Sequence, residues 1–355
     1  MQQSWKLTIR TVCISILLGF GAGVLGTALT SNYLSDYALT LGELSAPTRL
    51  SEELPRSSPQ TYGDAVREVT ESVLPGVVRF YSVGSYAEPF ASGAVLTSDG
   101  WILTSWEYPV SGAFVTAVIG GRSYPVVREV KDSFATGASF VKVDASNLPV
   151  FAFGSGFDLA PGDQLFAAPS PTALFAETVV EARWLTGSLS SDAPQRLVAI
   201  EDPLLGAYQG SPVVNVRGEL VGLVTHGSAG FTFVLPIDGV LPAFNAVLRE
   251  GNVTRAALGV NFVDLTRNLG LSEEDTLGLA QGALLRGTTS VKKGSAAAIA
   301  GLVPGDVVLS VDGVSVDAHR SLDELIVTHA PGDTLTLRVV SESGEREVKV
   351  TLGTL

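Results

Sequence analysis

The sequence has 355 residues, 46% of them hydrophobic and only 17% charged, which is enough apolar material for two domains that each bury a core. Its formal net charge of −13 at pH 7 argues against nucleic acid as a partner, because binding phosphates requires a basic surface. Cys13 is the single cysteine, which excludes disulfides within the chain and cysteine-based zinc sites.

The first predicted element is a membrane anchor. Lys6 and Arg10 precede an uncharged run, 11–35, which is long enough to cross a bilayer of about 30 Å at roughly 1.5 Å per residue. Positive charge before the run and Asp36 after it predict a cell-membrane protein with one transmembrane helix over 11–30, a cytoplasmic N-terminus and residues 36–355 outside. A cleaved signal peptide and a buried core helix are the alternatives; the length of the run favours the uncleaved anchor. Residues 1–35 are therefore assigned to the cytoplasmic tip and anchor.

A linker and a short helix are expected next. Residues 36–63 mix Pro, Ser, Thr and charged residues without sustained periodicity, which is typical of a tether. Segment 64–75 has Val66, Val69 and Val73 at helical spacing and stops at Pro75. We expect this helix to begin a folded domain over 64–250.

Short β-type runs separated by turn residues fill the chain from Gly76 to Leu248. Strands at this spacing predict an all-β barrel or sandwich. A helical pattern interrupts them only at FNAVLRE. The predicted strands are GVVRFYSVG, SGAVLTS, GWILTS, AFVTAVI, RSYPVVREV, SFVKVD, DQLFAAPS, RLVAIED, SPVVNVRGELVGLVT and GFTFVLPI.

Several of these runs resemble, in order and spacing, the landmarks of the HtrA/Deg family. The stretches are ASGAVLTSDGWILTS, SFVKVD, GSPVVNVRGELVGLVT and GFTFVLPID, and the resemblance extends from Asp64 to the end of the chain. It implies a mostly β protein outside the cytoplasmic membrane, with a trypsin-like double β-barrel of the serine peptidase type followed by a PDZ domain. Family members are commonly trimers, so the resemblance also implies a homo-oligomer.

The triad positions implied by this resemblance carry other residues. The family's chemistry needs a serine activated by a histidine that a carboxylate orients. Glu107 stands at the histidine position after GWILTS, Gly137 at the aspartate position before ASFVKVD, and Gln209 at the serine position within GAYQGSPVV. Gln209 is not a nucleophile. The sequence therefore predicts a peptidase fold that does not cut.

One relocation of the chemistry is conceivable. Ser211 lies two residues beyond the serine position, and His226 follows the strand VGLVT near the expected substrate cleft. The turn that should form the oxyanion hole contains Ala207 and Tyr208 in place of small flexible residues, and Tyr208 would tend to fill the cleft. An inactive fold, in which His226 is a surface residue, is favoured over a peptidase that uses Ser211 and His226.

Residues 253–355 resemble the PDZ domain of the same family, a small α+β fold, with AGLVPGD as the most specific stretch. By this resemblance, Ala257, Leu258, Gly259 and Val260 form the loop whose backbone N–H groups hold a chain-terminal carboxylate. Gly259 permits close approach of the ligand backbone. Strand Val260–Phe262, which includes Asn261, would pair with the ligand as an added edge strand.

A helix should form the other wall of the groove. SLDELIVTH places Leu322, Leu325 and Ile326 on one helical face, where they would line an apolar pocket for the ligand's last side chain. The alternative is that these three residues are ordinary core. Lys292 and Lys293 are expected on the solvated surface rather than in contact with a ligand.

Two functions remain. The favoured one is a membrane-anchored, extracytoplasmic binding or regulatory protein that captures protein or peptide C-termini through its PDZ groove. The alternative is an active serine endopeptidase in protein quality control with relocated residues. The sequence contains no metal-ligand constellation and no phosphate loop, so no cofactor and no metal are expected.

Overall fold

The computed structural model describes residues 62–82, 88–105, 115–133, 135–185, 189–201, 208–228, 230–267 and 270–355. The predicted membrane anchor over 11–30, nearly all of the linker and Glu107 lie outside these residues. Within the ranges described, no helix is long and apolar enough to cross a membrane.

The first element is the predicted helix, α2 (Tyr62–Val73), which continues into a 3₁₀ turn, η1 (Leu74–Gly76). Val69 and Val73 are buried in a core cluster shared with both barrels. Pro75 lies inside the 3₁₀ turn, where the α-helical hydrogen-bond pattern has ended. The helical spacing of the valines thus places α2 against the barrels, as predicted.

The first six strands after α2 form a closed antiparallel barrel in the order β1-β2-β3-β6-β5-β4. Buried residues alternate with half-buried ones along β4, the pattern of a strand with one face on a core. The bounds are β1 (Val77–Ser82), β2 (Ala91–Val95), β3 (Trp101–Ser105), β4 (Val115–Ile119), β5 (Arg122–Lys131) and β6 (Ala138–Val143).

A second closed barrel follows, in the order β10-β13-β12-β11-β7-β8. Its longest strand, β8, was not predicted, because the alanine, glutamate and arginine residues in it weaken both the alternation and the β-propensity. The bounds are β7 (Gln164–Ser170), β8 (Ala173–Leu185), β10 (Arg196–Ile200), β11 (Pro212–Asn215), β12 (Leu220–Ser228) and β13 (Phe231–Pro236).

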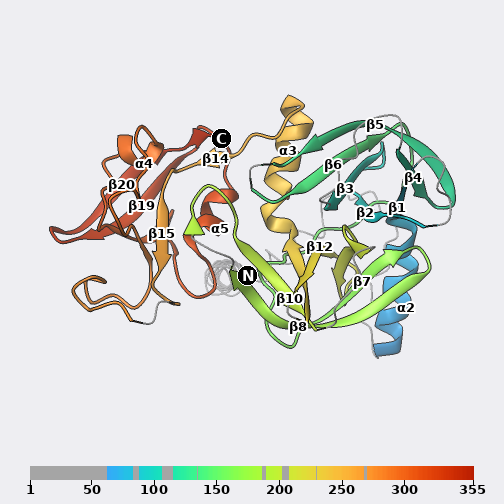
Figure 1. The fold of residues 1–355 in the computed structure, drawn as a ribbon, viewed down its shortest axis with the longest axis horizontal. Coiled ribbons are helices and arrows are strands. Elements are labelled where there is room, and N and C mark those ends of the chain that lie inside the picture. The colour runs from blue at the N-terminus through green and yellow to red at the C-terminus, as the bar shows by residue number, and fades with distance from the viewer. Residues whose placement is uncertain are drawn as a thin grey trace, which may run out of the picture. The chain divides into compact units, whose positions relative to one another are not determined.

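Helix α3 (Leu241–Glu250) follows a 3₁₀ turn, η3 (Ile237–Gly239), and closes the barrel region. The Phe244 ring stacks on Phe140 at 5.3 Å and meets Trp101 edge-on at 6.2 Å, so the helix packs on the first barrel. Gly251 ends α3 in the left-handed conformation and donates its N–H to the carbonyl of Val247. The chain then leaves the barrels (Figure 1).

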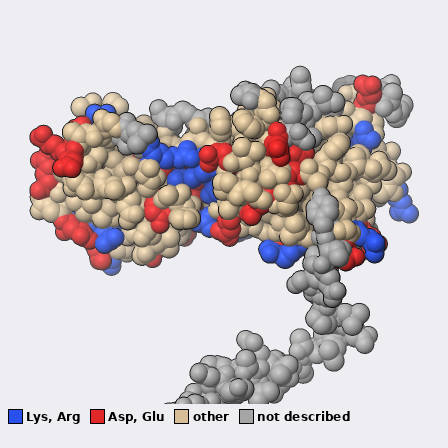
Figure 2. Space-filling model, turned by 90° about the horizontal axis from the view of Figure 1, so that it is seen from below, with Lys and Arg blue, Asp and Glu red and all other residues tan. Residues whose placement is uncertain are grey.

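The C-terminal region is a separate sheet flanked by two short helices, the predicted PDZ domain (Figure 1). Its sheet order is β20-β19-β17-β16-β15-β9, with β18 on β17 and a separate pair β14-β21. Acidic side chains gather on the face of this region that Figure 2 shows. The bounds are β14 (Ala256–Ala257), β15 (Asn261–Asp264), β16 (Ala283–Leu284), α4 (Ala296–Ile299), β17 (Val307–Val311), β18 (Val314–Ser315), α5 (Leu322–Val327), β19 (Thr334–Ser341), β20 (Gly344–Thr351) and β21 (Gly353–Thr354).

Strand β9 (Leu189–Ser190), at the edge of this sheet, does not come from the C-terminal region at all. It belongs to the connection between β8 and β10 of the second barrel. Figure 1 shows it in light green beside β15. The PDZ sheet is therefore completed by a segment of the barrel domain.

Candidate functional site

The predicted carboxylate loop has the geometry that its role requires. The carbonyl of Gly259 accepts the N–H of Lys292 at 2.9 Å, and the carbonyl of Leu258 accepts the N–H of Ala297 at 2.9 Å. With these carbonyls held on one side, the N–H groups of Leu258, Gly259 and Val260 are left to donate on the other. Gly259 lies at φ +84, and a Cβ there would lie 2.2 Å from the Cβ of Ser295. Only glycine fits this turn.

A carboxylate already occupies the loop, and it belongs to Asp192. The N–H groups of Leu258 and Gly259 donate to Asp192 Oδ1 at 3.1 and 2.8 Å. The third N–H, of Val260, donates to Ser191 Oγ at 3.0 Å. Lys292 Nζ lies 2.6 Å from Asp192 Oδ2. A side-chain carboxylate therefore stands where a chain-terminal carboxylate was predicted.

The residues before Asp192 pair with β15 as an added strand. Ser190 lies opposite Asn261 and Leu189 opposite Phe262, in antiparallel register. The N–H of Ser191 donates to the carbonyl of Val260 at 2.9 Å. Residues 189–192, which we name the plug, thus run along β15 and end at the carboxylate loop, the arrangement expected of a bound peptide.

The apolar wall of the groove contacts the plug as well. Leu189 is buried in the same cluster as Phe262, Leu322 and Ile326. Leu322 and Ile326 are fully buried, so they are core residues in this state, while Leu325 is only partly buried at the edge of the cluster. The predicted helical face therefore shares a buried cluster with β15, and a leucine from the barrel domain belongs to the same cluster.

Buried charges join α5 to the second barrel beside the plug. Arg183 Nε lies 3.4 Å from Glu324 Oε1, and Arg196 Nη1 lies 3.5 Å from Glu324 Oε2. Arg183 Nη2 also pairs with Asp264 Oδ2 at 2.9 Å. Burial raises the pKa of the Glu324 carboxyl, and the two guanidinium groups oppose that shift. Burial likewise lowers the pKa of Arg196. Each charge here depends on its partners, because all four side chains are buried.

A second buried carboxylate, Asp323, meets the chain just after the plug. Its Oδ2 accepts the N–H of Gln195 at 3.1 Å, and its Oδ1 accepts the hydroxyl of Ser321 at 2.6 Å. Burial raises the pKa of Asp323, and the hydrogen bonds oppose the shift. Asp323 and Glu324, near the start of α5, therefore both bond to residues of the barrel domain.

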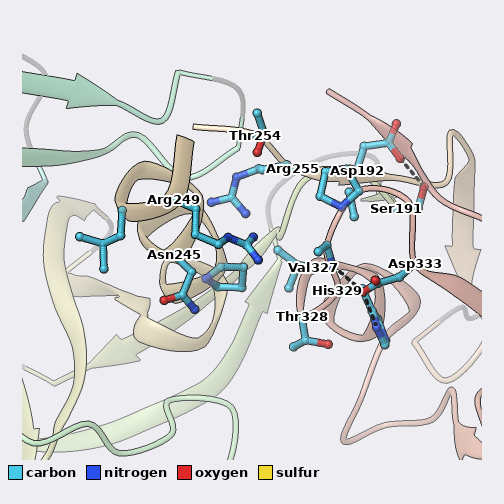
Figure 3. Close-up of a pocket in the computed structure, with 15 residues that line it drawn as sticks. Ser191, Asp192, Asn245, Arg249, Thr254, Arg255, Val327, Thr328, His329 and Asp333 are labelled. Carbon is cyan, nitrogen blue, oxygen red and sulfur yellow. Dashed lines mark hydrogen bonds and ion pairs between the residues drawn. The ribbon is translucent and has the colours of Figure 1, made fainter. Parts of the chain in front are cut away.

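A cavity of about 400 Å³ adjoins the plug on the side of α3. Ser191 and Asp192 line one side of it, and Asn245 and Arg249 of α3 line another (Figure 3). Figure 3 also shows the hydroxyl of Ser191 donating to Asp192 Oδ1, at 2.8 Å. The plug thus packs against the PDZ domain on one side, and Ser191 and Asp192 line this cavity on the other.

The triad was expected in the barrel region, and two of its three positions are described by the structure. Gly137 occupies a turn at φ +70 before β6, and its N–H donates to the carbonyl of Asp132 at 3.1 Å. Gln209 is half-buried, and its carbonyl accepts the N–H of Ser92 at 2.9 Å. The next residue, Gly210, lies at φ +79 with the carbonyl of Ser92 only 2.2 Å from where a Cβ would be. Gly137 and Gln209 thus lie in backbone turns and supply neither a carboxylate nor a hydroxyl.

Ser211 and His226, the relocated pair considered from the sequence, each contact other groups. Ser211 is fully buried, and its hydroxyl donates to the carbonyl of Tyr208 at 2.5 Å. His226 is exposed; its ring packs against Phe233 at 5.1 Å, and its Nδ1 lies 3.1 Å from the hydroxyl of Thr225. Both groups are engaged with other partners.

The plug and its pairing with Lys292 were not predicted from the sequence. Lys292 and Lys293 are exposed, as expected, and the ammonium group of Lys292 also pairs with the Asp192 carboxylate that fills the loop. Ser191 and Asp192 belong to a polar turn, SSDAP, that carries no signal of strand or ligand. Only the antiparallel register with a strand some seventy residues away reveals their role.

Comparisons with known proteins agree with this architecture. The PDZ domain family matches residues 256–352. A probable periplasmic serine endoprotease, DegP-like, of Halomonas elongata is 30% identical over 275 residues, covering 74% of this chain and 56% of the relative. Its counterpart in Hahella chejuensis is 29% identical over 279 residues, covering 76% of this chain and 58% of the relative. The chain therefore spans less than two thirds of the length of these relatives.

Solved structures show the same fold. The HtrA-type protease AlgW with a tripeptide aligns with a TM-score of 0.59 at 21% identity, covering 81% of this chain and 97% of that one. The same protease with a decapeptide gives a TM-score of 0.54 at 20% identity, with coverage of 81% and 98%. The resemblance seen in the sequence is thereby confirmed: this chain is a member of the HtrA/Deg family, with a trypsin-like double β-barrel followed by a PDZ domain.

Proposed function

We propose that this protein is a membrane-anchored, extracytoplasmic HtrA-family pseudoprotease that binds the C-termini of proteins or peptides through its PDZ groove. The observation that carries the proposal is the carboxylate of Asp192 on the N–H groups of Leu258 and Gly259. A loop that holds one carboxylate with two backbone donors and a lysine has the chemistry to hold a terminal carboxylate.

The absence of cutting is proposed on the residues of the cleft. Hydrolysis needs a nucleophile, a base and a group that orients the base. Glu107, Gly137 and Gln209 stand at these positions in the sequence. The hydroxyl of Ser211 is buried and donates to the carbonyl of Tyr208.

Three further parts of the proposal have other grounds. The location outside the cytoplasm is proposed from the periplasmic relatives, and the membrane anchor from the charge pattern around residues 11–30. The homo-oligomer is proposed from the family resemblance alone.

The test is a binding measurement on the purified full chain. A library of immobilised decapeptides with free C-termini is probed, and the tightest binder is remade with a carboxylate and with an amide. We expect the acid to bind at least about tenfold more tightly, because charge-assisted hydrogen bonds contribute about 1.5–3 kcal/mol each. Equal binding of acid and amide would contradict the proposal.

Catalysis is tested on the same preparation. We expect no hydrolysis of an unfolded casein and no labelling by a serine-reactive phosphonate. Labelling at Ser211 that disappears in His226→Ala would instead establish a peptidase with relocated residues.

A further inference from the structure

We infer that the plug, residues 189–192, is a built-in competing ligand of the PDZ groove, which an incoming C-terminal peptide must displace. The inference rests on the proposed function and states how that site is regulated. It follows from three features of the plug: its register, its carboxylate and its imperfect match to the loop.

The register of the plug is that of a ligand rather than of a casual contact. Ser191 donates its N–H to the carbonyl of Val260, and the two residues before it pair with Asn261 and Phe262 in order. A peptide adding a strand to β15 would need the same main-chain donors and acceptors. The plug and an incoming peptide therefore cannot occupy β15 together.

The carboxylate is the second feature. Asp192 takes two of the three loop N–H groups and also the ammonium group of Lys292. These are charge-assisted hydrogen bonds, the strong kind that would hold a ligand's terminus. A ligand carboxylate can bind only after Asp192 leaves.

The imperfect match makes displacement possible. The third loop N–H, of Val260, receives a serine hydroxyl instead of a carboxylate oxygen. Ser191 stands where the last residue of a ligand would stand. Its hydroxyl accepts the N–H of Val260 and donates to Asp192 Oδ1. A true C-terminus offers two carboxylate oxygens and an apolar last side chain, so it can make contacts that the plug does not make.

Two features next to the plug keep it near the groove and give it space to move out: its attachment to the second barrel and the cavity beside α3. The plug is tethered to the second barrel, since β8 ends at Leu185 and β10 begins at Arg196, so its local concentration at the groove is high. The cavity between the plug and α3 gives Ser191 and Asp192 space to leave the groove. Apparent affinity for an external peptide is then lowered by the fraction of molecules in the open state.

The first test removes the charge of the plug. In the full chain, Asp192→Asn should bind the acid decapeptide at least about tenfold more tightly than the unchanged protein. The matched control is Asp158→Asn, which removes another barrel–PDZ ion pair, with Arg320 at 2.6 Å, outside the groove. This control should leave the affinity within about twofold. Equal tightening by both variants would overturn the inference, because loosening of the domains would then explain the effect.

The second test locks the plug in place. Ser190 and Asn261 lie directly opposite each other next to the hydrogen-bonded pair of Ser191 and Val260, which makes them a close, non-hydrogen-bonded pair suited to a disulfide. The variant is Ser190→Cys with Asn261→Cys, in a Cys13→Ser background. Oxidation should abolish binding of the acid decapeptide, and reduction should restore it. Unchanged binding in the oxidised form, with the disulfide verified by mass, would overturn the inference.

The outcomes separate this inference from the proposed function. If the unchanged protein and Asp192→Asn bind the acid decapeptide equally, the plug is not a competitor, yet the groove remains a C-terminus site. If no peptide in the library binds either protein, the proposed function fails, and the inference fails with it.

Discussion

The triad region of the double barrel and the carboxylate loop of the PDZ domain differ in which of the groups predicted from the sequence are present. In the barrels, Gly137 and Gln209 lie in turns held by main-chain hydrogen bonds, so the positions expected for the aspartate and the serine supply neither a carboxylate nor a hydroxyl. In the PDZ domain, three of the four predicted loop residues, Leu258, Gly259 and Val260, donate their N–H groups to the plug.

The difference follows from which atoms do the work. A triad depends on three particular side chains, so three substitutions remove its chemistry while the barrels fold unchanged. A carboxylate loop depends on backbone N–H groups, which every residue except proline supplies, and on one glycine that permits the turn. A binding function is therefore harder to lose by point substitution than a catalytic one.

The largest expected effect concerns the charges that fix the groove to the barrel. Glu324→Ala leaves Arg183 and Arg196 buried without their shared partner, and we expect a loss of about 3–5 kcal/mol in the free energy of unfolding. Urea denaturation measures it. Glu345→Ala, which removes an exposed pair with Arg338, is the control and should cost about 1 kcal/mol or less. Similar losses in the two variants would mean that the cluster is not as desolvated as its burial indicates.

A pair of glycines compares the two regions directly. Gly259→Ala places a Cβ against Ser295, and Gly210→Ala places one against the carbonyl of Ser92, both at positive φ. We expect each to lower the free energy of unfolding by about 2–4 kcal/mol, from backbone strain and overpacking together. Only Gly259→Ala should also weaken binding of the acid decapeptide, since Gly210 lies in the cleft.

The control for strain is Gly305→Ala. Gly305 lies at φ +97 with nothing within 4 Å of where its Cβ would be, so it reports the backbone term alone, about 1–2 kcal/mol. If Gly259→Ala costs no more than Gly305→Ala, the contact with Ser295 relaxes easily. If Gly210→Ala weakens peptide binding as strongly as Gly259→Ala, the two regions are not independent.

A smaller effect is expected from pH. Burial raises the pKa of Asp323 in the folded protein above its ordinary value. Its contribution to stability is therefore full below the unfolded pKa of about 3.9 and is lost as the pH rises through the folded pKa. We expect the stability of Asp323→Asn relative to the unchanged protein to increase from about pH 4 towards neutrality. Unfolding at a series of pH values measures it, and parallel curves would show that the carboxyl titrates alike in both states.

The sequence predicted the architecture because the barrel strands and the PDZ turns are local patterns. Val66, Val69 and Val73 placed α2, and Gly259 marked the carboxylate loop. The plug was beyond reach for a physical reason: its strand pairing and its carboxylate contacts join residues far apart in the chain. Nothing in the local pattern around Asp192 distinguishes a ligand carboxylate from a solvated one.

The smallest effect, no gain of hydrolysis at all, is expected when the three triad residues are restored. The variant is Glu107→His, Gly137→Asp and Gln209→Ser together, and we expect no hydrolysis of casein and no phosphonate labelling above the unchanged protein. At position 137 the described residues leave space for a side chain, since none of their atoms lies within 4 Å of the Cβ position, but the φ of +70 strains any residue other than glycine there. The obstacle is the turn at 208–211. A serine in that turn also needs backbone N–H groups directed at the oxyanion.

The turn is held by its own contacts. The Tyr208 ring lies 5.7 Å from the Phe175 ring, and the Tyr208 carbonyl accepts both the N–H and the hydroxyl of Ser211. The carbonyl of Gln209 is held by Ser92. Adding Ala207→Gly and Tyr208→Gly to the restored triad separates the two causes: activity only in this larger variant would locate the block in the turn. Hydrolysis by the three-residue variant alone would contradict the prediction, because the backbone around the triad would then have kept a working geometry. The triad region would in that case differ from the carboxylate loop only in the loss of three side chains.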